Sequence, residues 1–145
     1  MATVATLLAR KPSDVYAIGP TDSVLDAARL MNARHIGGLV VLTSDRHLVG
    51  MFTERDILTR VVARQLDPAT TRVEEVMTTP VAVCRRETPV EECRAAMTAR
   101  RIRHLPVVDG ERLVGILTTG DILAHEVSEQ GSTIEFLSEY LFGGR

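Results

Sequence analysis

Hydrophobic positions along the first half of the chain follow two spacings, one typical of helices and one typical of strands. The stripe at helical spacing consists of Val24, Ala27, Ala28 and Met31. Short apolar runs lie at residues 14–18, before this stripe, and at residues 39–42 and 47–52, after it. A second helix is expected from Thr53 onward. The pattern therefore predicts the order strand, helix, strand, strand, helix.

The same order occurs a second time along the chain. Five positions recur 66 residues later, as the pairs Val24 and Val90, Met31 and Met97, Ala33 and Ala99, Ile36 and Ile102, and Leu39 and Leu105. After the next loop the offset is 65, so that the Gly-x-x-Thr-x-x-Asp strings Gly50, Thr53, Asp56 and Gly115, Thr118, Asp121 correspond. The lost residue falls in a predicted hairpin loop, where a change of length costs little free energy.

In the second copy the apolar pattern predicts strands at residues 81–84, 105–108 and 112–117, with a hairpin turn at Asp109-Gly110. Helix starts are expected at Asp22 or Ser23 in the first copy. In the second copy Thr88 is the expected N-cap and Pro89 the first helical residue.

Each copy is too small to bury its sheet comfortably alone, at about 60 residues. We therefore expect an α/β (α+β) fold of two β-α-β-β-α repeats packed about a pseudo-twofold axis. The predicted boundaries are 1–65 for the first repeat, 66–127 for the second and 128–145 for a helical tail. The tail sequence Ser132-Thr133-Ile134-Glu135 is typical of a capping box, and predicts a short helix before Gly143.

Composition and charge exclude several function classes. The net charge of −2 over 145 residues argues against a nucleic-acid partner, and no apolar run is long enough for a membrane span. The expected location is the cytoplasm. Cys84 and Cys93 occupy positions that are apolar in the other copy, which predicts buried packing. No metal site is expected and no catalytic residues are expected, because the histidines are scattered and no triad spacing occurs.

The duplicated Gly-x-x-Thr-x-x-Asp string has two interpretations. It falls where a strand ends and a helix begins, so the threonine and the aspartate can simply form a capping box. The same geometry also suits a nucleotide, because free N–H groups and a hydroxyl can bind phosphate while a carboxylate accepts hydrogen bonds from a ribose diol. The residues alone leave both interpretations open.

Two longer stretches resemble cystathionine-β-synthase (CBS) domains. In the second copy they are residues 101–108, Arg-Ile-Arg-His-Leu-Pro-Val-Val, and residues 113–122, Leu-Val-Gly-Ile-Leu-Thr-Thr-Gly-Asp-Ile. In the first copy residues 35–41 and 53–56 match the same pattern, with Gly38 where the second copy has His104. The whole is similar to a CBS pair, or Bateman module, acting as a stand-alone regulatory protein rather than as an enzyme.

The resemblance implies a regulatory ligand that contains adenosine, such as AMP, ADP, ATP, NAD or S-adenosylmethionine, and no obligatory cofactor. It assigns ribose to Asp56 and Asp121, and phosphate to Thr53 and Thr118. Further expected ligand contacts are Ser13, Thr79, Arg55, Arg103 and His104. It also implies a homodimer. The departure at Gly38 predicts that the two sites are unequal.

Two functions remain open from the sequence. The first is a sensor, for example of energy state, in which ligand binding changes the conformation that an effector protein recognises. The second is an interaction or scaffold module with vestigial nucleotide sites, for example one that regulates redox enzymes.

Overall fold

The computed structural model describes residues 2–12 and 14–129. The elements of the first half are β1 (Ala17–Ile18), α2 (Val24–Arg34), β2 (Gly38–Leu42), β3 (Leu48–Thr53), α3 (Glu54–Asp56) and the π-helix η1 (Ile57–Val62). Those of the second half are α5 (Val90–Arg100), β4 (His104–Asp109), β5 (Arg112–Thr118) and α6 (Thr119–Glu129). Two short helices, α1 (Val4–Leu8) and α4 (Val73–Val76), precede the two halves. The predicted mixed fold of two repeats is confirmed.

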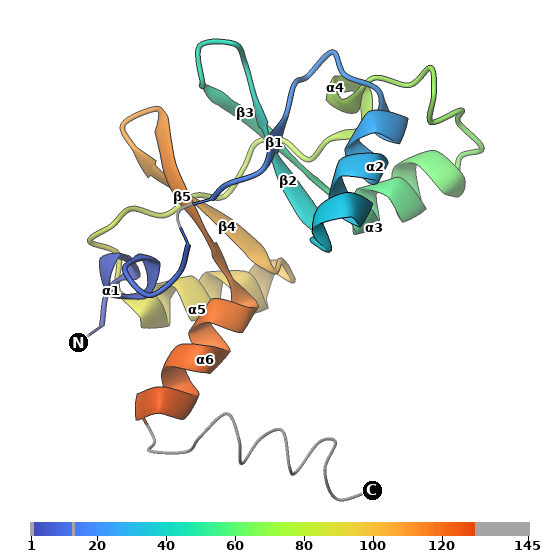
Figure 1. The fold of residues 1–145 in the computed structure, drawn as a ribbon. Helices are drawn as coiled ribbons and strands as arrows, with labels where there is room; N and C mark the ends of the chain where they lie inside the picture. The colour runs from blue at the N-terminus through green and yellow to red at the C-terminus, as the bar shows by residue number, and fades with distance from the viewer. Residues whose placement is uncertain (1, 13, 130–145) are drawn as a thin grey trace, which may run out of the picture.

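Each half is built on an antiparallel hairpin, and the two hairpins lie beside each other with the helices outside them (Figure 1). In the first half β1 pairs in parallel with β2, which pairs with β3. In the second half β4 pairs with β5. The turn at Gly110 has a φ of 65°, which a glycine adopts without strain.

The predicted strand at residues 81–84 is wrong, because only a single parallel bridge forms there, between Cys84 and Val107. In the first half the corresponding β1–β2 pairing places Ala17 opposite Val40. The position equivalent to Val40 is Pro106, which has no N–H group to donate to a neighbouring strand. Only two backbone hydrogen bonds therefore join these segments. Cys84 N donates to Pro106 O, and Val108 N donates to Cys84 O, both at 2.9 Å.

The helix starts are confirmed in the first half and shifted in the second. Ser23 is the N-cap of α2, and its hydroxyl accepts a bond of 3.0 Å from the N–H of Asp26. In α5 the N-cap is Pro89 itself, one residue later than expected. The Thr88 hydroxyl instead accepts from Arg85 N at 3.0 Å, so it closes the preceding turn rather than the helix.

The short helices α1 and α4 are exchanged between the halves: each packs on the half that does not directly follow it in the sequence. Val4 and Leu7 of α1 belong to the buried cluster of the second half, and α1 lies beside β5 and α5 in Figure 1. Val73 and Val76 of α4 belong to the buried cluster of the first half. Each half therefore completes its core with a segment that precedes the other half in sequence. The predicted division of the chain at residue 65 does not anticipate this exchange.

A third apolar cluster joins the two halves. Val40 and Met51 of the first hairpin pack there with Leu113 of the second. Burying these side chains removes apolar surface from water on both hairpins at once, so the halves form one packed body. The tail helix predicted near residues 132–142 lies outside the described residues. Among the described residues, no helix has the length and apolar character to cross a membrane.

Candidate functional site

The Gly-x-x-Thr-x-x-Asp string of the first half forms the expected capping box. The N–H of Thr53 donates to Asp56 Oδ2 at 3.0 Å, and the N–H of Asp56 donates to Thr53 Oγ1 at 3.3 Å. Two helix-terminal donors are thereby satisfied. The structural interpretation of this string is therefore correct, but it accounts for only one of the two carboxylate oxygens.

The other oxygen of Asp56 is held by residues that sequence reasoning missed. Thr78 donates its hydroxyl to Asp56 Oδ1 at 3.0 Å, and Arg60 Nε lies 3.7 Å from the same atom. Asp56 is only 5% exposed. A buried carboxylate needs such partners, because an unpaired charge away from water is costly. Thr78 reaches Asp56 only because α4 crosses to the first half.

Arg60 connects this carboxylate to the end of α4. Its Nη1 donates to Met77 O at 2.8 Å and to Val76 O at 3.3 Å. Arg60 lies in the π-helix η1, a rare winding that is frequent at functional sites, whereas the equivalent helix α6 is a regular α-helix. Arg60 of the first half thus holds the segment that ends at Thr78, by hydrogen bonds to the backbone carbonyls just before it.

A cleft of about 940 Å³ opens above Asp56 and is lined by both halves. We call it the central cleft. From the first half it is lined by Gly37, Met51, Thr53, Glu54, Arg55, Asp56, Leu58, Thr59 and Arg60. From the remaining chain it is lined by Thr78, Pro80, Val81, Ala82, Arg100, Arg101, Ile102, Arg103 and His104. This volume lies within the range of small-molecule sites, about 300–1,000 Å³.

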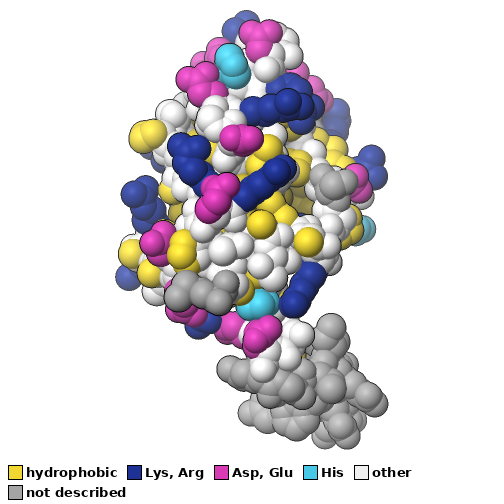
Figure 2. Space-filling view, turned by 90° about the vertical axis from the view of Figure 1, so that its left-hand side faces the viewer, with side chains coloured by type: hydrophobic (Ala, Val, Ile, Leu, Met, Phe, Trp, Pro, Cys, Tyr) yellow, Lys and Arg dark blue, Asp and Glu magenta, His cyan; other side chains and the backbone are white. Residues whose placement is uncertain are grey.

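The central cleft is rich in arginine. Arg55, Arg100, Arg101 and Arg103 are exposed side chains in its lining. None of the four forms an ion pair with another described residue. On the face shown in Figure 2, positive and negative side chains are interspersed. The cleft therefore concentrates guanidinium groups, which bind phosphate through paired N–H groups.

His104 lies at the start of β4 and is partly buried in this cleft. Burial lowers the pKa of its imidazole, the nearby Glu54 carboxylate opposes this shift, and Arg103 and Lys11 add to it. The folded protein therefore favours the neutral imidazole near neutral pH. Neutral His104 can still donate one hydrogen bond to a ligand.

The predicted site residues divide into separate groups. Thr53, Arg55, Asp56, Arg103 and His104 meet in the central cleft, although they come from the two halves. Thr79 is exposed and is not part of the lining, whereas its neighbours Thr78 and Pro80 are. Ser13 lies outside the described residues.

Thr118 and Asp121 lie in the second half and are not part of the lining of the central cleft. They form their own capping box, with Thr118 N donating to Asp121 Oδ2 at 2.8 Å and Asp121 N donating to Thr118 Oγ1 at 3.2 Å. The partner of this carboxylate differs from that of Asp56. It is the ammonium group of Lys11, 2.8 Å from Oδ2.

The cysteines are buried in the second half, as expected from the repeat. Burial raises the pKa of the Cys84 thiol to about 12, and the neighbouring Cys93 adds to this rise. A thiol in this state is a poor nucleophile. Within residues 2–12 and 14–129, no group of three or more histidine, cysteine or carboxylate side chains could hold a metal ion.

Comparison with known proteins agrees with the duplicated fold. The chain is 32% identical over 127 residues to the CBS domain-containing protein CBSX3, mitochondrial, of Arabidopsis thaliana, covering 85% of this chain and 62% of that protein. The solved structure of a signal-transduction protein with CBS domains from Burkholderia ambifaria is 39% identical and superposes with a TM-score of 0.85, covering 92% of this chain and 99% of the other.

A third relative has been solved with ligands. The CBS domain pair of protein MJ0100, in complex with 5′-methylthioadenosine and S-adenosyl-L-methionine, is 26% identical with a TM-score of 0.77, covering 88% of this chain and 98% of the other. CBS pairs are regulatory modules. The CBS domain family matches this chain twice, at residues 8–63 and 73–128. The chain therefore belongs to the CBS-domain family and consists largely of a CBS pair.

Proposed function

We propose that this CBS pair is a regulatory module that binds an adenosine phosphate in the central cleft. The observation that carries the proposal is the meeting, in one cleft, of a buried carboxylate cradle around Asp56 and of four arginines that lack an ion-pair partner among the described residues. The adenosine compounds bound by the pair from MJ0100 support an adenosine ligand for the same fold.

Asp56 and Thr78 are suited to the ribose. Asp56 Oδ1 accepts the Thr78 hydroxyl at 3.0 Å, and Oδ2 accepts the N–H of Thr53. Oδ2 also accepts the Thr53 hydroxyl at 3.3 Å. An ionised carboxylate has about four lone-pair sites, so it can still accept one bond from a ribose hydroxyl. The Thr78 hydroxyl has lone pairs of its own and can accept from the second ribose hydroxyl.

The phosphates would lie toward the arginines. Arg55 follows Thr53 at the start of the helix, and Arg100, Arg101 and Arg103 come from the end of α5 and the start of β4. Each added phosphate brings negative charge into this group of cations, and charge-assisted hydrogen bonds are the strong ones. We therefore expect ADP and ATP to bind more tightly than AMP, and AMP more tightly than adenosine.

Binding in a cleft lined by both halves supports a regulatory output. A ligand shifts a conformational equilibrium only by its differential affinity for the two states. A nucleotide that touches both halves has such a difference whenever their relative placement changes. An effector protein that recognises this placement would read the signal.

A homodimer through the helices is also part of the proposal. Leu58 and Val62 of η1 are each 62% exposed, and Leu123 of α6 is 57% exposed. Leu58 and Leu123 are equivalent positions of the two repeats. Apolar side chains repeated in this way suit a contact with a second copy. Replacing Leu58 by Glu should then lower the molecular mass measured in solution, and an unchanged mass would contradict this contact.

The proposal is tested by thermal unfolding in the presence of adenosine, AMP, ADP, ATP, S-adenosylmethionine and GDP. A ligand that binds only the folded state raises the unfolding midpoint with its concentration. The proposal predicts a rise that increases with the number of phosphates and is absent with GDP. An equal rise with GDP would contradict the adenine preference. No rise with any compound at millimolar concentration would favour the scaffold function.

A further inference from the structure

The two repeats supply different partners to the aspartate of the repeated string. Asp56 receives the hydroxyl of Thr78, whereas Asp121 receives the ammonium group of Lys11. We infer that Lys11 occupies the carboxylate of Asp121 and blocks ribose binding there, so that the chain has one open adenosine site instead of two. This inference rests on the proposed function, because it concerns the second copy of the proposed ribose-binding carboxylate.

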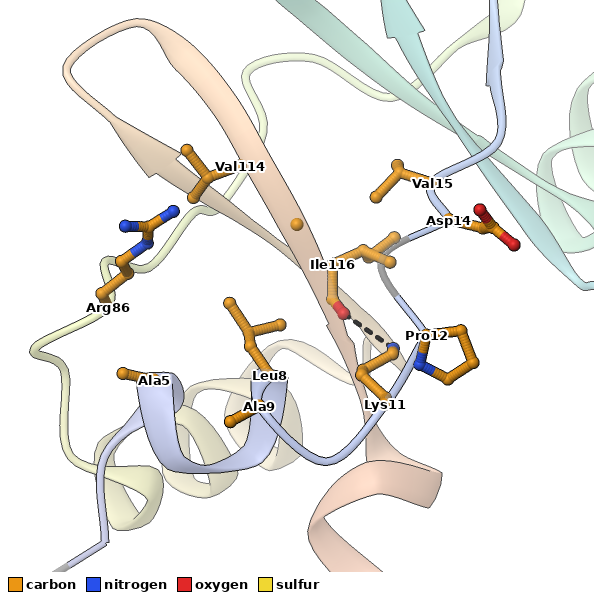
Figure 3. A pocket seen from close by; sticks show the side chains of 11 residues that line it. Ala5, Leu8, Ala9, Lys11, Pro12, Asp14, Val15, Arg86, Val114 and Ile116 are labelled. Carbon is orange, nitrogen blue, oxygen red and sulfur yellow. Dashed lines mark hydrogen bonds between the residues drawn. The ribbon is translucent and has the colours of Figure 1, made fainter.

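The contacts of Lys11 engage one of the two carboxylate oxygens of Asp121. Its Nζ donates to Asp121 Oδ2 at 2.8 Å and to Ile116 O at 2.9 Å, the latter drawn in Figure 3. The same Oδ2 already accepts the N–H of Thr118. A ribose that used this oxygen would have to displace an ammonium group that is hydrogen-bonded to it. At Asp56 the nearest cation, Arg60, lies 3.7 Å from Oδ1 and donates to the carbonyl of Met77 instead.

Lys11 is held in place by the exchange of the short helices. Val4 and Leu7 anchor α1 in the core of the second half, and Lys11 follows α1 by three residues. Its neighbour Arg10 is also docked, with Nη1 3.2 Å from Nδ1 of His125 on α6. Figure 3 shows Lys11 joined to the carbonyl of Ile116 on β5, with Leu8 of α1 beside the same strand. The ammonium group is therefore positioned by packed structure rather than by a free side chain.

In the first half the positive charge lies on the other side of the equivalent contact between the helix and the incoming segment. There the helix carries the cation, Arg60, and the incoming segment offers the carbonyl of Met77 and the hydroxyl of Thr78. In the second half the incoming segment carries the cations, Arg10 and Lys11. This reversal explains why two strings of the same sequence pattern present unequal surfaces to a ligand.

The pocket beside Lys11 is small and does not include Thr118 or Asp121 in its lining. The pocket that Lys11 lines has about 340 Å³, against about 940 Å³ for the central cleft. Its other lining residues are mostly apolar, including Ala5, Leu8 and Val114, as Figure 3 shows. Arg86 is the arginine in this lining, whereas the central cleft has five. A phosphorylated ligand therefore finds less room and less positive charge there.

The test is calorimetric titration of the full chain with ADP, which reports how many ligands bind. We compare the wild type with Lys11→Met, with Asp56→Asn and with the double variant. Arg10→Met is the matched control, because it removes a positive charge from the same segment without touching Asp121. Lys11→Gln is a second variant in case Lys11→Met does not fold, and unfolding midpoints establish that each protein is folded.

We expect one ADP per chain for the wild type and for Arg10→Met, two for Lys11→Met, and none for Asp56→Asn. The double variant should regain one ADP, bound in the second half. Two ligands on the wild type, or one on both wild type and Lys11→Met, would overturn the role of Lys11 and leave the proposed function standing. Binding by Lys11→Met alone would support Lys11 as the block but contradict the central cleft as the site. No binding by any variant would contradict both.

Discussion

The imidazole of His104 lies against Gly38, which is the equivalent residue of the other repeat. A Cβ atom on Gly38 would stand 3.2 Å from Cε1 and 3.3 Å from Nδ1 of that ring. Since the two positions correspond in the repeat, the pseudo-twofold axis brings them together. A histidine at both would not fit, so the sequence difference at Gly38 is a packing requirement of the site.

Replacing Gly38 by Ala should therefore destabilise the protein and weaken nucleotide binding. The new methyl would also meet Met51 Cε at 3.0 Å. Overpacking of this kind costs about 1–3 kcal/mol in the free energy of unfolding. Denaturant unfolding measures the loss, with Gly120→Ala as control, because its Cβ would lie an ordinary 3.6 Å from Thr118 Oγ1. Equal stability of the two variants would show that His104 is free to move.

The lowered pKa of His104 predicts a pH dependence of stability. Burial favours the neutral ring of His104 in the folded state. In the unfolded chain the same imidazole takes up a proton at about pH 6.5. Below that pH the unfolded state binds more protons, so stability falls as the pH falls through this range. His104→Gln should flatten this part of the profile of unfolding free energy against pH. Glu54, Arg103 and Lys11 stay in place in that variant, and an unchanged slope would contradict the assignment.

Removing a cleft arginine should affect phosphorylated ligands selectively. Arg103→Gln is expected to weaken ADP binding about tenfold, which corresponds to the loss of roughly 1.4 kcal/mol from a charge-assisted contact. Adenosine binding should hardly change. Calorimetry with both ligands measures the difference, and Arg86→Gln serves as the control because Arg86 lines the smaller pocket. An equal loss for ADP and adenosine would indicate a structural role for Arg103.

The exchange of short helices predicts that α1 stabilises the second half. Leu7 is buried in that core, so Leu7→Ala should lower the free energy of unfolding by about 2–5 kcal/mol. Leu66→Ala, at an exposed position, should change it little. Hydrogen exchange would locate the effect in α5, β4 and β5. Faster exchange in the first half alone would contradict this packing.

The repeat made most of the fold predictable, because one set of spacings had to be satisfied twice. The apolar residues 81–84 alone predict a strand that does not form, because Pro106 on the neighbouring strand has no N–H group to donate. The five residues of α1 are too few to give a periodic signal from which a helix can be predicted.

The candidate site was predictable only in part. Thr53 and Asp56 carry a local signal, because a capping box has a fixed spacing. Thr78 and Lys11 carry none, since their partners lie 22 and 110 residues away and are reached through the exchange of helices. Arg100 and Arg101 follow a helix stripe and resemble ordinary solvated surface. Their place in the cleft depends on how the two halves pack.

The measurement that tests the account most directly is the affinity for ADP of the wild type and of Asp56→Asn. Asparagine keeps the shape and one acceptor oxygen, so the capping box can persist, while the charge that holds the ribose is lost. Asp45→Asn, at an exposed position, is the control. The account predicts wild-type affinity for the control and a loss of ADP binding for Asp56→Asn, with both proteins folded. Equal affinity of all three proteins would contradict the central cleft as the nucleotide site.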